Sequence, residues 1–295
     1  MKVLVTGASG FLGRAVAAQI IANGHEVRTF QRRPSGVPGA EDHLGSIIDS
    51  AAVDAAMVGV DAIVHLAAKV SLTGDRSDFD RINVGGTRTL LNEAQYAGIG
   101  KMVFVSSPSV AHAGTSIMGD DALPASPRTA RGDYARTKAQ AELLALTADS
   151  PTLRVVAVRP HLVWGPGDTQ LVKRIVDRAR AKRLPLLGDG AALIDTLYID
   201  NAATGIAAAL ERVDAVHGNS YVLTNGEPRP VAELLAGMCA AAGVPAPAWS
   251  VPPAVARTAG SLVEKVWAFR AGADEPPMTR FLAEQLSTAH WFDQR

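Results

Sequence analysis

Five short apolar segments, separated by longer amphipathic ones, constrain the fold of this chain more than any other feature. The apolar segments are rich in β-branched residues and lie at 3–6, 27–30, 62–66, 102–106 and 155–159. Their nearly continuous hydrophobicity is typical of strands that are buried on both faces, as in a parallel sheet. Helical patterns lie between them, at 12–23, 79–97 and 134–147. This alternation predicts an α/β fold, a doubly wound parallel sheet with helices on both faces.

A glycine-rich loop follows the first apolar segment and opens the first helical one. It spans residues 6–13, Thr-Gly-Ala-Ser-Gly-Phe-Leu-Gly, with glycines at Gly7, Gly10 and Gly13. Such glycines allow a tight turn, close approach of the backbone to a pyrophosphate and close packing of helix on strand, while the helix N-terminus attracts phosphate. An ordinary glycine-rich turn is the alternative, but strand, glycines and helix all stand in the required order. The loop is therefore predicted to bind a dinucleotide.

The end of the second strand bears on the choice of dinucleotide. An NAD site usually has an acidic residue about 20 residues after the glycines, where it binds the ribose 2′-hydroxyl. Here the strand ends in Phe-Gln-Arg-Arg, without an acid. Arg32 and Arg33 could donate charge-assisted hydrogen bonds to a 2′-phosphate, although either could equally be a solvated arginine at a strand end. The missing acid is the stronger argument, and it favours NADP(H).

The character of the chain changes after Trp164. Glycine and proline cluster at 164–168 and 184–190, and further helical patterns follow at 171–181, 201–212 and 231–242. We expect a dinucleotide-binding Rossmann domain over residues 1–163. Residues 164–295 are expected to form mostly a smaller substrate-binding cap, with some segments returning to the Rossmann sheet. The cap would cover the carboxyl edge of the sheet, where open α/β sheets bind their ligands.

A tyrosine and a lysine are four residues apart in the helical pattern at 134–147. Tyr134 and Lys138 would therefore lie on one face of a helix. A tyrosine, with an ordinary pKa of about 10, transfers protons near neutral pH only if its phenolate is stabilised, and a neighbouring ammonium group does this. Ser107 follows the fourth apolar segment and could hydrogen-bond a substrate oxygen. The three residues form a candidate catalytic group.

Together these motifs resemble the extended short-chain dehydrogenases/reductases. The matching segments, which extend over nearly the whole chain, are 6–13, 64–68, 83–87, 106–107, 134–138, 159–160 and 164–168. The resemblance implies that Ser107, Tyr134 and Lys138 are catalytic, with Tyr134 as the general acid/base. It also implies cofactor contacts from Gly7, Ser9, Gly10, Phe11, Leu12, Gly13, Leu66, Ala67, Ala68, Tyr134, Lys138, Pro160, His161 and Val163.

Two departures from the family pattern affect what the resemblance implies. Relatives often have Gly-Asp-Leu after the third strand, with the acid near the adenine, whereas this chain has a glycine followed by Ser46 and Ile47. The serine hydroxyl could still accept a hydrogen bond from the adenine amine, so both residues are kept as cofactor contacts. Relatives also commonly continue beyond the segment at 290–293 into a last helix. Whether a C-terminal piece of the cap is missing here is left open.

Residues 106–110, 159–168 and 290–293 resemble the 3β-hydroxysteroid dehydrogenase branch of the family. Within that branch they are most similar to the β-keto acid reductases of bacterial long-chain olefin biosynthesis. The resemblance implies reversible reduction of a 2-alkyl-3-oxoalkanoate to the 2-alkyl-3-hydroxyalkanoate, and the NADP(H) site predicted above fits such a net reduction. A hydrophobic pocket suits such a substrate, and the cap is rich in apolar residues. Val255, Leu262, Val266 and Phe269 recur at near-helical spacing and either line this pocket or pack the cap.

Three other functions are weighed against this one. A sterol or 3β-hydroxysteroid dehydrogenase of the same branch is the nearest. A nucleotide-sugar epimerase shares every motif of the extended family named above but usually keeps NAD tightly bound through each cycle. A non-enzymatic sensor of the NADP redox state typically lacks the tyrosine–lysine pair that is present here.

Composition excludes several further classes. The 29 basic and 29 acidic residues give no formal net charge, which argues against a general nucleic-acid binder. Cys239, the single cysteine, cannot form an intrachain disulfide, and the seven histidines show no metal-ligand spacing. His65, at the end of an apolar strand, is expected to be a core histidine whose ring nitrogens have partners.

The longest uncharged stretch, 234–256, contains four prolines that would break a membrane-spanning helix. We therefore expect no transmembrane segment and a cytoplasmic location. The helices at 79–97 and 134–147 resemble the pair through which many relatives dimerise, which predicts a homodimer. Association with other enzymes of an olefin pathway is implied by the resemblance alone.

Overall fold

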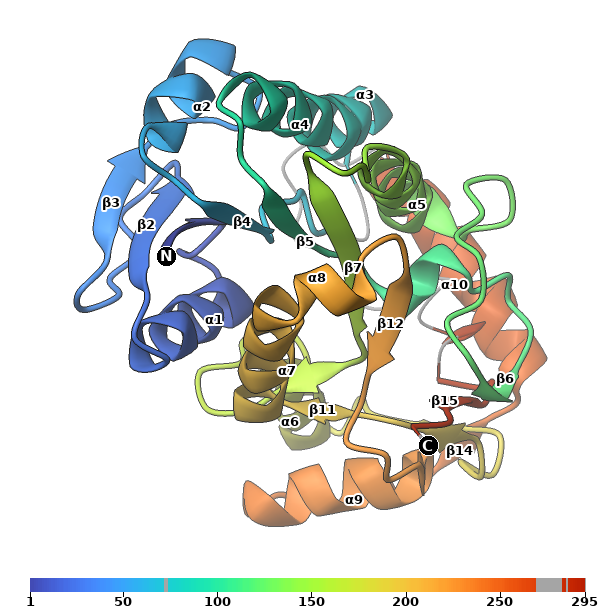
Figure 1. The fold of residues 1–295 in the computed structure, drawn as a ribbon. Helices are drawn as coiled ribbons and strands as arrows, with labels where there is room; N and C mark the ends of the chain where they lie inside the picture. The colour runs from blue at the N-terminus through green and yellow to red at the C-terminus, as the bar shows by residue number, and fades with distance from the viewer. Residues whose placement is uncertain (72–73, 269–282, 285, 295) are drawn as a thin grey trace.

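A seven-stranded parallel sheet forms the centre of the computed structural model, which describes residues 1–71, 74–268, 283–284 and 286–294 (Figure 1). The strand order is β3-β2-β1-β4-β5-β7-β12, and every neighbouring pair is parallel. The strands are β1 Lys2–Thr6, β2 Glu26–Gln31, β3 Glu41–Leu44, β4 Ala62–His65, β5 Lys101–Val105, β7 Arg154–Pro160 and β12 Ser220–Leu223. The predicted doubly wound parallel sheet is confirmed.

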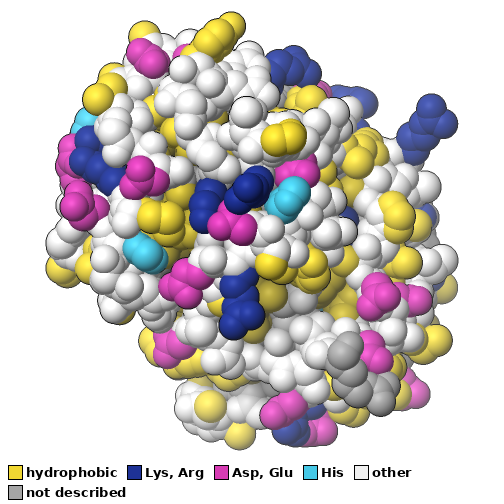
Figure 2. Space-filling view, in the orientation of Figure 1, with side chains coloured by type: hydrophobic (Ala, Val, Ile, Leu, Met, Phe, Trp, Pro, Cys, Tyr) yellow, Lys and Arg dark blue, Asp and Glu magenta, His cyan; other side chains and the backbone are white. Residues whose placement is uncertain are grey.

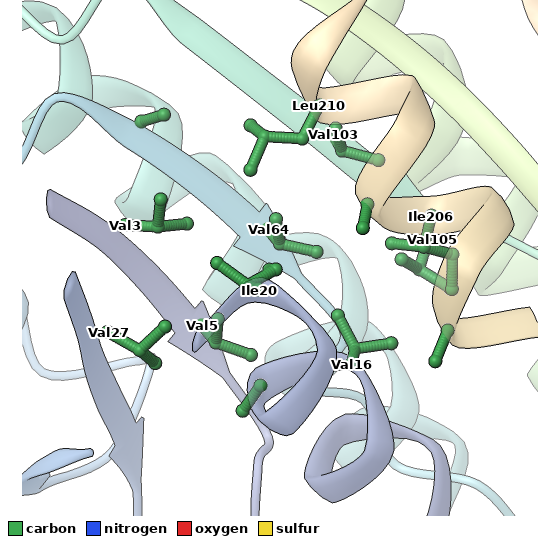
Figure 3. Packing of buried hydrophobic residues seen from close by; sticks show 14 of the residues in the cluster. Val3, Val5, Val16, Ile20, Val27, Val64, Val103, Val105, Ile206 and Leu210 are labelled. Atoms are coloured by element: carbon green, nitrogen blue, oxygen red, sulfur yellow. The ribbon is translucent and has the colours of Figure 1, made fainter. Parts of the chain in front are cut away.

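Helices cover both faces of this sheet. The first face carries α1 (Phe11–Ala22), α7 (Ile199–Glu211) and α8 (Val213–Val216), and the second carries α2 (Ser50–Met57), α4 (Gly86–Tyr96) and α5 (Gly132–Thr147). Because side chains alternate along a strand, Val3 and Val5 pack towards α1 and α7, whereas Leu4 packs on the opposite side. Figure 3 shows the first cluster, where Ile20 and Ile206 approach the strand valines.

The helix predicted over 79–97 is interrupted. It begins as α3 (Arg76–Phe79), continues as a π-helical segment (Asp80–Gly85) and becomes α4. Asn83 lies in the π-helical segment and is buried. Its side-chain oxygen accepts a hydrogen bond from the Lys69 backbone N–H at 2.7 Å, and its amide donates to Thr137 Oγ1 on α5 at 3.0 Å. The interruption therefore joins the segment after β4 to the helix that bears Tyr134.

Smaller sheets and three helices lie beyond the carboxyl edge of the central sheet. The four-stranded sheet has the order β13-β10-β15-β6, and two-stranded sheets pair β11 with β8 and β14 with β9. Helix α6 packs on α9. The bounds are β6 Ile117–Asp120, β8 Val163–Trp164, α6 Val172–Arg180, β9 Leu186–Leu187, β10 Leu193–Ile194, β11 Leu197–Tyr198, β13 Arg229–Pro230, α9 Val231–Ala241, β14 Ser250–Val251, α10 Pro253–Ala268 and β15 His290–Phe292.

The predicted helix at 201–212 is one of the segments after residue 164 that return to the central sheet. The corresponding α7 packs against α1 and the sheet, and β12 follows it as the outermost strand. The reason is burial, since Ile206 and Leu210 are fully buried against strand valines. The apolar pattern of this helix suits packing in the cap or on the central sheet. The helix packs on the sheet because it covers apolar strand residues there.

Two of the four apolar residues expected to line the pocket or pack the cap can be placed in the structure, on helix α10. Val255 and Leu262 are exposed by 56% and 64%, so neither side chain is packed in a core. The side chain of Val266 and all of Phe269 lie outside the described residues.

Acidic and basic side chains are interspersed over the face shown in Figure 2. This matches a formal net charge of zero. Within the described ranges, the structure contains no helix that is both long enough and apolar enough to cross a membrane.

Replacing a buried residue of α7 tests its place in the central core. We expect Ile206→Ala to lower the free energy of unfolding by about 2–5 kcal/mol, because it removes buried methyl groups and leaves a cavity. Thr204→Ala, at an exposed position of the same helix, is the control and should change it by less than ~0.5 kcal/mol. Urea titration measures both. Equal effects would contradict the assignment of α7 to the core.

Candidate active site

Most sequence-predicted site residues gather at one edge of the central sheet. The glycine loop follows β1, residues 66–68 follow β4, Ser107 follows β5, and the segment at 160–163 spans the end of β7 and the start of β8. These four strands are neighbours and run parallel, so their carboxyl ends meet at the same edge. Arg32 and Arg33 follow β2, and Ser46 and Ile47 follow β3, further along this edge.

The glycine loop has the geometry of a pyrophosphate cradle. Gly7 adopts φ = +78°, and a Cβ atom there would lie 2.9 Å from the backbone N and Cα of Ala67. A Cβ on Gly13 would lie only 2.3 Å from the carbonyl oxygen of Gly7. Gly10 caps α1 without a side-chain hydrogen bond, and it is exposed. The N–H groups of the first turn are therefore left for a ligand, and these residues fit a dinucleotide phosphate.

Arg32 and Arg33 are exposed directly beyond β2, and neither has a hydrogen-bond or ion-pair partner in the described part of the chain. Gln31 ends the strand and donates to Oδ1 of Asp42 at 3.2 Å. Asp42 also accepts a hydrogen bond from the Ser35 backbone N–H at 3.1 Å, so its carboxylate supports the loop after the arginines. Beyond β3, Ile47 is buried and packs against Gly86 of α4. A Cβ atom on Gly86 would lie only 2.5 Å from the Cδ1 atom of Ile47.

A buried hydrogen-bond chain supports the ends of β1 and β4. Thr6 Oγ1 accepts from the backbone N–H of Ala67 at 3.1 Å and contacts His65 Nδ1 at 2.7 Å. His65 Nε2 contacts Thr87 Oγ1 at 3.1 Å, and the Thr87 hydroxyl donates to the Asn83 carbonyl at 2.7 Å. The prediction that His65 is a satisfied core histidine is confirmed. Burial lowers the pKa of His65 to about 3, with a smaller contribution from Lys138, so its ring is neutral.

Tyr134 and Ser107 line the same cavity. Ser107 caps the short 3₁₀ helix Pro108–Val110, and its Oγ lies 2.9 Å from Ser109 Oγ. Tyr134 lies in the first turn of α5, where burial raises its pKa to about 12 while a hydrogen bond with the Ser107 side chain opposes the shift. Tyr134 is therefore protonated near neutral pH in this state and can donate a proton.

Lys138 lies one helical turn after Tyr134 and is 3% exposed. Its Nζ donates to the Val105 carbonyl at 2.7 Å and lies 4.1 Å from the centre of the Phe104 ring. Burial lowers the pKa of Lys138 to about 7, and the charge of Glu142 opposes this shift. Glu142 itself forms a buried ion pair with Arg159 of β7, whose Nε donates to it at 3.0 Å.

The cavity has a volume of about 360 Å³. Its wall includes Ser107 and Tyr134 and also residues of α6, α9, β10 and β15. Apolar side chains form much of its wall, and they come from several segments: Val70, Pro108, Ile117, Pro160, Leu162, Leu171, Ile175, Leu184, Ile194, Leu235, Leu286 and Phe292. Leu162 has φ = +46°, an unusual conformation for a bulky residue.

The polar part of this wall includes residues that the sequence patterns did not bring together. His112, His161 and His290 all line the cavity, as do Arg174 and Arg178 of α6. His161 was predicted only as a cofactor contact. The available signals were the position of His161 directly after Pro160 and the presence of His290 in the terminal His-Trp-Phe-Asp segment. Neither signal indicated that these residues are close in space.

A dinucleotide-binding loop beside a serine, a tyrosine and a lysine defines a nicotinamide-dependent oxidoreductase. The chain belongs to the NAD dependent epimerase/dehydratase family, whose sequence profile matches residues 3–224. It is an extended short-chain dehydrogenase/reductase, as the sequence motifs predicted.

Curated relatives match almost the entire chain. A 2-alkyl-3-oxoalkanoate reductase of Stenotrophomonas maltophilia is 41% identical, with 99% of this chain and 91% of the relative covered. A protein of the same name from Shewanella oneidensis is 37% identical, covering 98% and 78%. A 3-beta-hydroxysteroid dehydrogenase of Mycolicibacterium neoaurum is 30% identical, covering 99% and 83%.

Solved structures show the same fold. The crystal structure of gox2253 has a TM-score of 0.77 and 29% identity, covering 98% of this chain and 88% of the other. The structure of MoeE5 in complex with UDP-glucose and NAD has a TM-score of 0.73 and 25% identity, covering 85% and 86%.

Titration of Lys138 gives a prediction about stability. Its pKa falls from 10.5 to about 7 on folding, so the unfolded chain binds more protons between these values. Lys138 therefore destabilises the fold most below pH 7, and this penalty disappears as the pH rises towards 10.5. We expect wild type to gain unfolding free energy relative to Lys138→Met over this range, on the order of a few kcal/mol. Denaturant titrations of both proteins from pH 6 to 10 measure the difference. A constant difference would contradict the shifted pKa.

Proposed function

We propose that this protein uses NADP(H) to reduce the 3-keto group of a hydrophobic 2-alkyl-3-oxoalkanoate. The observation that carries the proposal is the position of Tyr134, a protonated acid that shares a largely apolar cavity with Ser107. The names of the relatives from Stenotrophomonas maltophilia and Shewanella oneidensis support the substrate class. A role in olefin biosynthesis is part of the same proposal, because this role requires that the protein acts on a 2-alkyl-3-oxoalkanoate.

In the proposed reaction, Tyr134 donates its proton to the oxygen of the keto group. Ser107 orients that oxygen through its hydroxyl, which already interacts with Tyr134 in this structure. Lys138, one turn later on α5, stabilises the resulting phenolate when it carries its proton, and it is proposed to interact with the cofactor ribose. When bound, the reduced cofactor supplies the hydride. In this structure the Tyr134 phenol keeps its proton over the whole neutral range, which is the form that a proton donor requires.

The residues proposed to hold the cofactor lie around the carboxyl edge of the sheet. The loop around Gly7 and Gly10 would bind the pyrophosphate, and Arg32 and Arg33 would bind the 2′-phosphate that distinguishes NADP(H) from NAD(H). The remaining proposed contacts are Ser9, Phe11, Leu12, Gly13, Ser46, Ile47, Leu66, Ala67, Ala68, Tyr134, Lys138, Pro160, His161 and Val163. Residues 1–163 then serve mainly the cofactor, and the segments from α6 and α9 form the substrate cap.

A 3β-hydroxysteroid dehydrogenase is the second candidate. The relative from Mycolicibacterium neoaurum supports it, and an apolar cavity also suits a steroid. Activity on a 3-hydroxysteroid, measured beside activity on 2-alkyl-3-oxo acids, distinguishes the two. A nucleotide-sugar epimerase fits less well, because a sugar nucleotide requires many polar partners and the wall of this cavity is largely apolar. The homodimer and the cytoplasmic location stay predictions.

Removing both arginines tests cofactor choice. We expect wild type to bind NADPH at least about tenfold more tightly than NADH, a difference of about 1.4 kcal/mol. Arg32→Ala/Arg33→Ala should remove this preference by weakening NADPH alone, because both side chains are proposed to contact the 2′-phosphate. Arg88→Ala, at an exposed position on α4, is the control. Fluorescence titration measures the affinities of each protein for both cofactors. Equal binding of NADPH and NADH by wild type would contradict the proposal.

Removing the phenol tests the catalytic role. Tyr134→Phe should lower kcat for a 2-alkyl-3-oxo acid by about 100-fold or more, because the proton donor is lost. NADPH should still bind, since the ring and the glycine loop remain. Tyr221→Phe, at a partly exposed strand position, should retain activity. Substantial turnover by Tyr134→Phe in a coupled absorbance assay would remove Tyr134 from this role.

A further inference from the structure

Three histidines from distant parts of the chain meet in the wall of the cavity that Ser107 and Tyr134 also line. His112 follows the 3₁₀ helix that Ser107 caps, His161 follows β7, and His290 belongs to β15. Their exposed fractions are 3%, 5% and 2%. Such burial of polar rings carries a desolvation cost that requires partners.

The three rings form a connected group. His161 Nε2 and His290 Nδ1 are 3.0 Å apart, and their ring centroids are 4.9 Å apart. The His112 and His290 ring centroids are 6.0 Å apart, with the rings nearly perpendicular. The left-handed backbone of Leu162 directly follows His161, so the chain adopts an uncommon conformation where it presents this ring.

The hydrogen bonds of His112 show where its proton lies. The backbone N–H of Gly114 donates to His112 Nδ1 at 3.3 Å, so Nδ1 is an acceptor. Burial lowers the pKa of His112. The charge of Glu284 opposes this shift and that of Arg131 adds to it, so the ring is neutral near pH 7. A neutral ring that accepts at Nδ1 carries its proton on Nε2. That buried N–H has no acceptor among the described residues, and His161 Nδ1 is likewise buried without a partner there.

A metal site and a purely structural role both fit these histidines less well than a ligand site does. In the described ranges, no cluster of three or more histidine, cysteine, aspartate or glutamate side chains has an arrangement that could hold a metal ion. A purely structural role predicts satisfied nitrogens, as at His65, whose two nitrogens contact Thr6 and Thr87. His112 and His161 instead each have a buried nitrogen without a partner among the described residues, and both residues line the cavity. For the N–H at His112 Nε2, the missing partner is an acceptor, which a ligand can supply.

We propose that His112, together with His161, binds the carboxylate of the substrate. The inference rests on the proposed function, because that substrate class supplies the carboxylate. In a 2-alkyl-3-oxo acid the carboxyl carbon is only two bonds from the keto carbon. The carboxylate must therefore lie close to Ser107 and Tyr134, in the cavity that the histidines also line, while the alkyl chains extend among the apolar residues.

Ser109 links His112 to Ser107 through one backbone and one side-chain contact. Ser109 contacts Ser107 through its hydroxyl at 2.9 Å, and its carbonyl accepts from the His112 backbone N–H at 3.3 Å. A hydrogen bond from a neutral N–H to a carboxylate is charge-assisted, and it gains strength in an apolar cavity. His112 is thus a substrate-specificity residue, while proton donation remains with Tyr134.

A pair of substrates and a pair of variants test this inference. The oxidative direction is used, since 3-hydroxy acids do not lose carbon dioxide as 3-oxo acids do. The substrates are a 2-alkyl-3-hydroxyalkanoic acid and the secondary alcohol that lacks only its carboxyl group, each with NADP⁺. His112→Met and His112→Gln have similar size, but only glutamine keeps an N–H near the position of Nε2.

We expect His112→Met to lower kcat/KM for the acid by on the order of tenfold to a hundredfold, and for the alcohol by less than about threefold. His112→Gln should recover most of the activity on the acid. Equal losses on both substrates would overturn the proposal, because they indicate a structural role. A loss specific to the acid in Arg178→Met, and not in His112→Met, would overturn it in favour of a carboxylate site on α6. Failure of wild type to oxidise the acid at all would instead reject the proposed function.

The wild-type protein provides a measurement that does not depend on folding of the variants. With ¹⁵N-labelled histidine and NADP⁺ present, the hydroxy acid should shift a histidine Nε2–H resonance that the matched alcohol leaves unchanged. The same shift with both compounds would contradict carboxylate binding.

Discussion

The close approach of three backbone segments at the end of β1 is the constraint on which the rest of the structure depends. Gly13 lies against the Gly7 carbonyl and Gly7 against Ala67, at distances that leave no room for a side chain. This packing fixes the start of α1 relative to β1 and β4. The free N–H groups of α1 and the ends of the neighbouring strands are thereby brought to one edge, where cofactor and substrate can meet.

Helix α5, which bears Tyr134 and Lys138, is held at this edge by buried polar groups as well as by apolar packing. Arg159 of β7 pairs with Glu142 of α5, and both side chains are 1% exposed. Removing one partner of such a pair leaves an uncompensated buried charge, so the pair strongly specifies how α5 lies on the sheet. Asn83 contacts Thr137 on the same helix. Tyr134 and Lys138 are therefore positioned by residues outside the proposed catalytic group.

The sequence predicted the elements that depend on local pattern. Continuous apolar segments such as that in β5 indicated the buried parallel strands, and the glycine spacing indicated the phosphate loop. The sequence did not predict where α7 packs, because an amphipathic helix suits either a sheet or a cap. It also contained no sign that His112, His161 and His290 form one group. Those residues are far apart in the chain, and β15 brings His290 to the others by pairing with β10 and β6.

The sequence by itself determined the fold class, the dinucleotide loop and the tyrosine–lysine pair. Each of these is encoded over a few neighbouring residues, through strand hydrophobicity, glycine spacing or the period of a helix. Only the tertiary structure decided the shape of the cavity, the high pKa of Tyr134, the burial of Lys138 and the unpaired nitrogens of His112 and His161 among the described residues. These properties depend on desolvation and on contacts between distant segments, which no local pattern specifies.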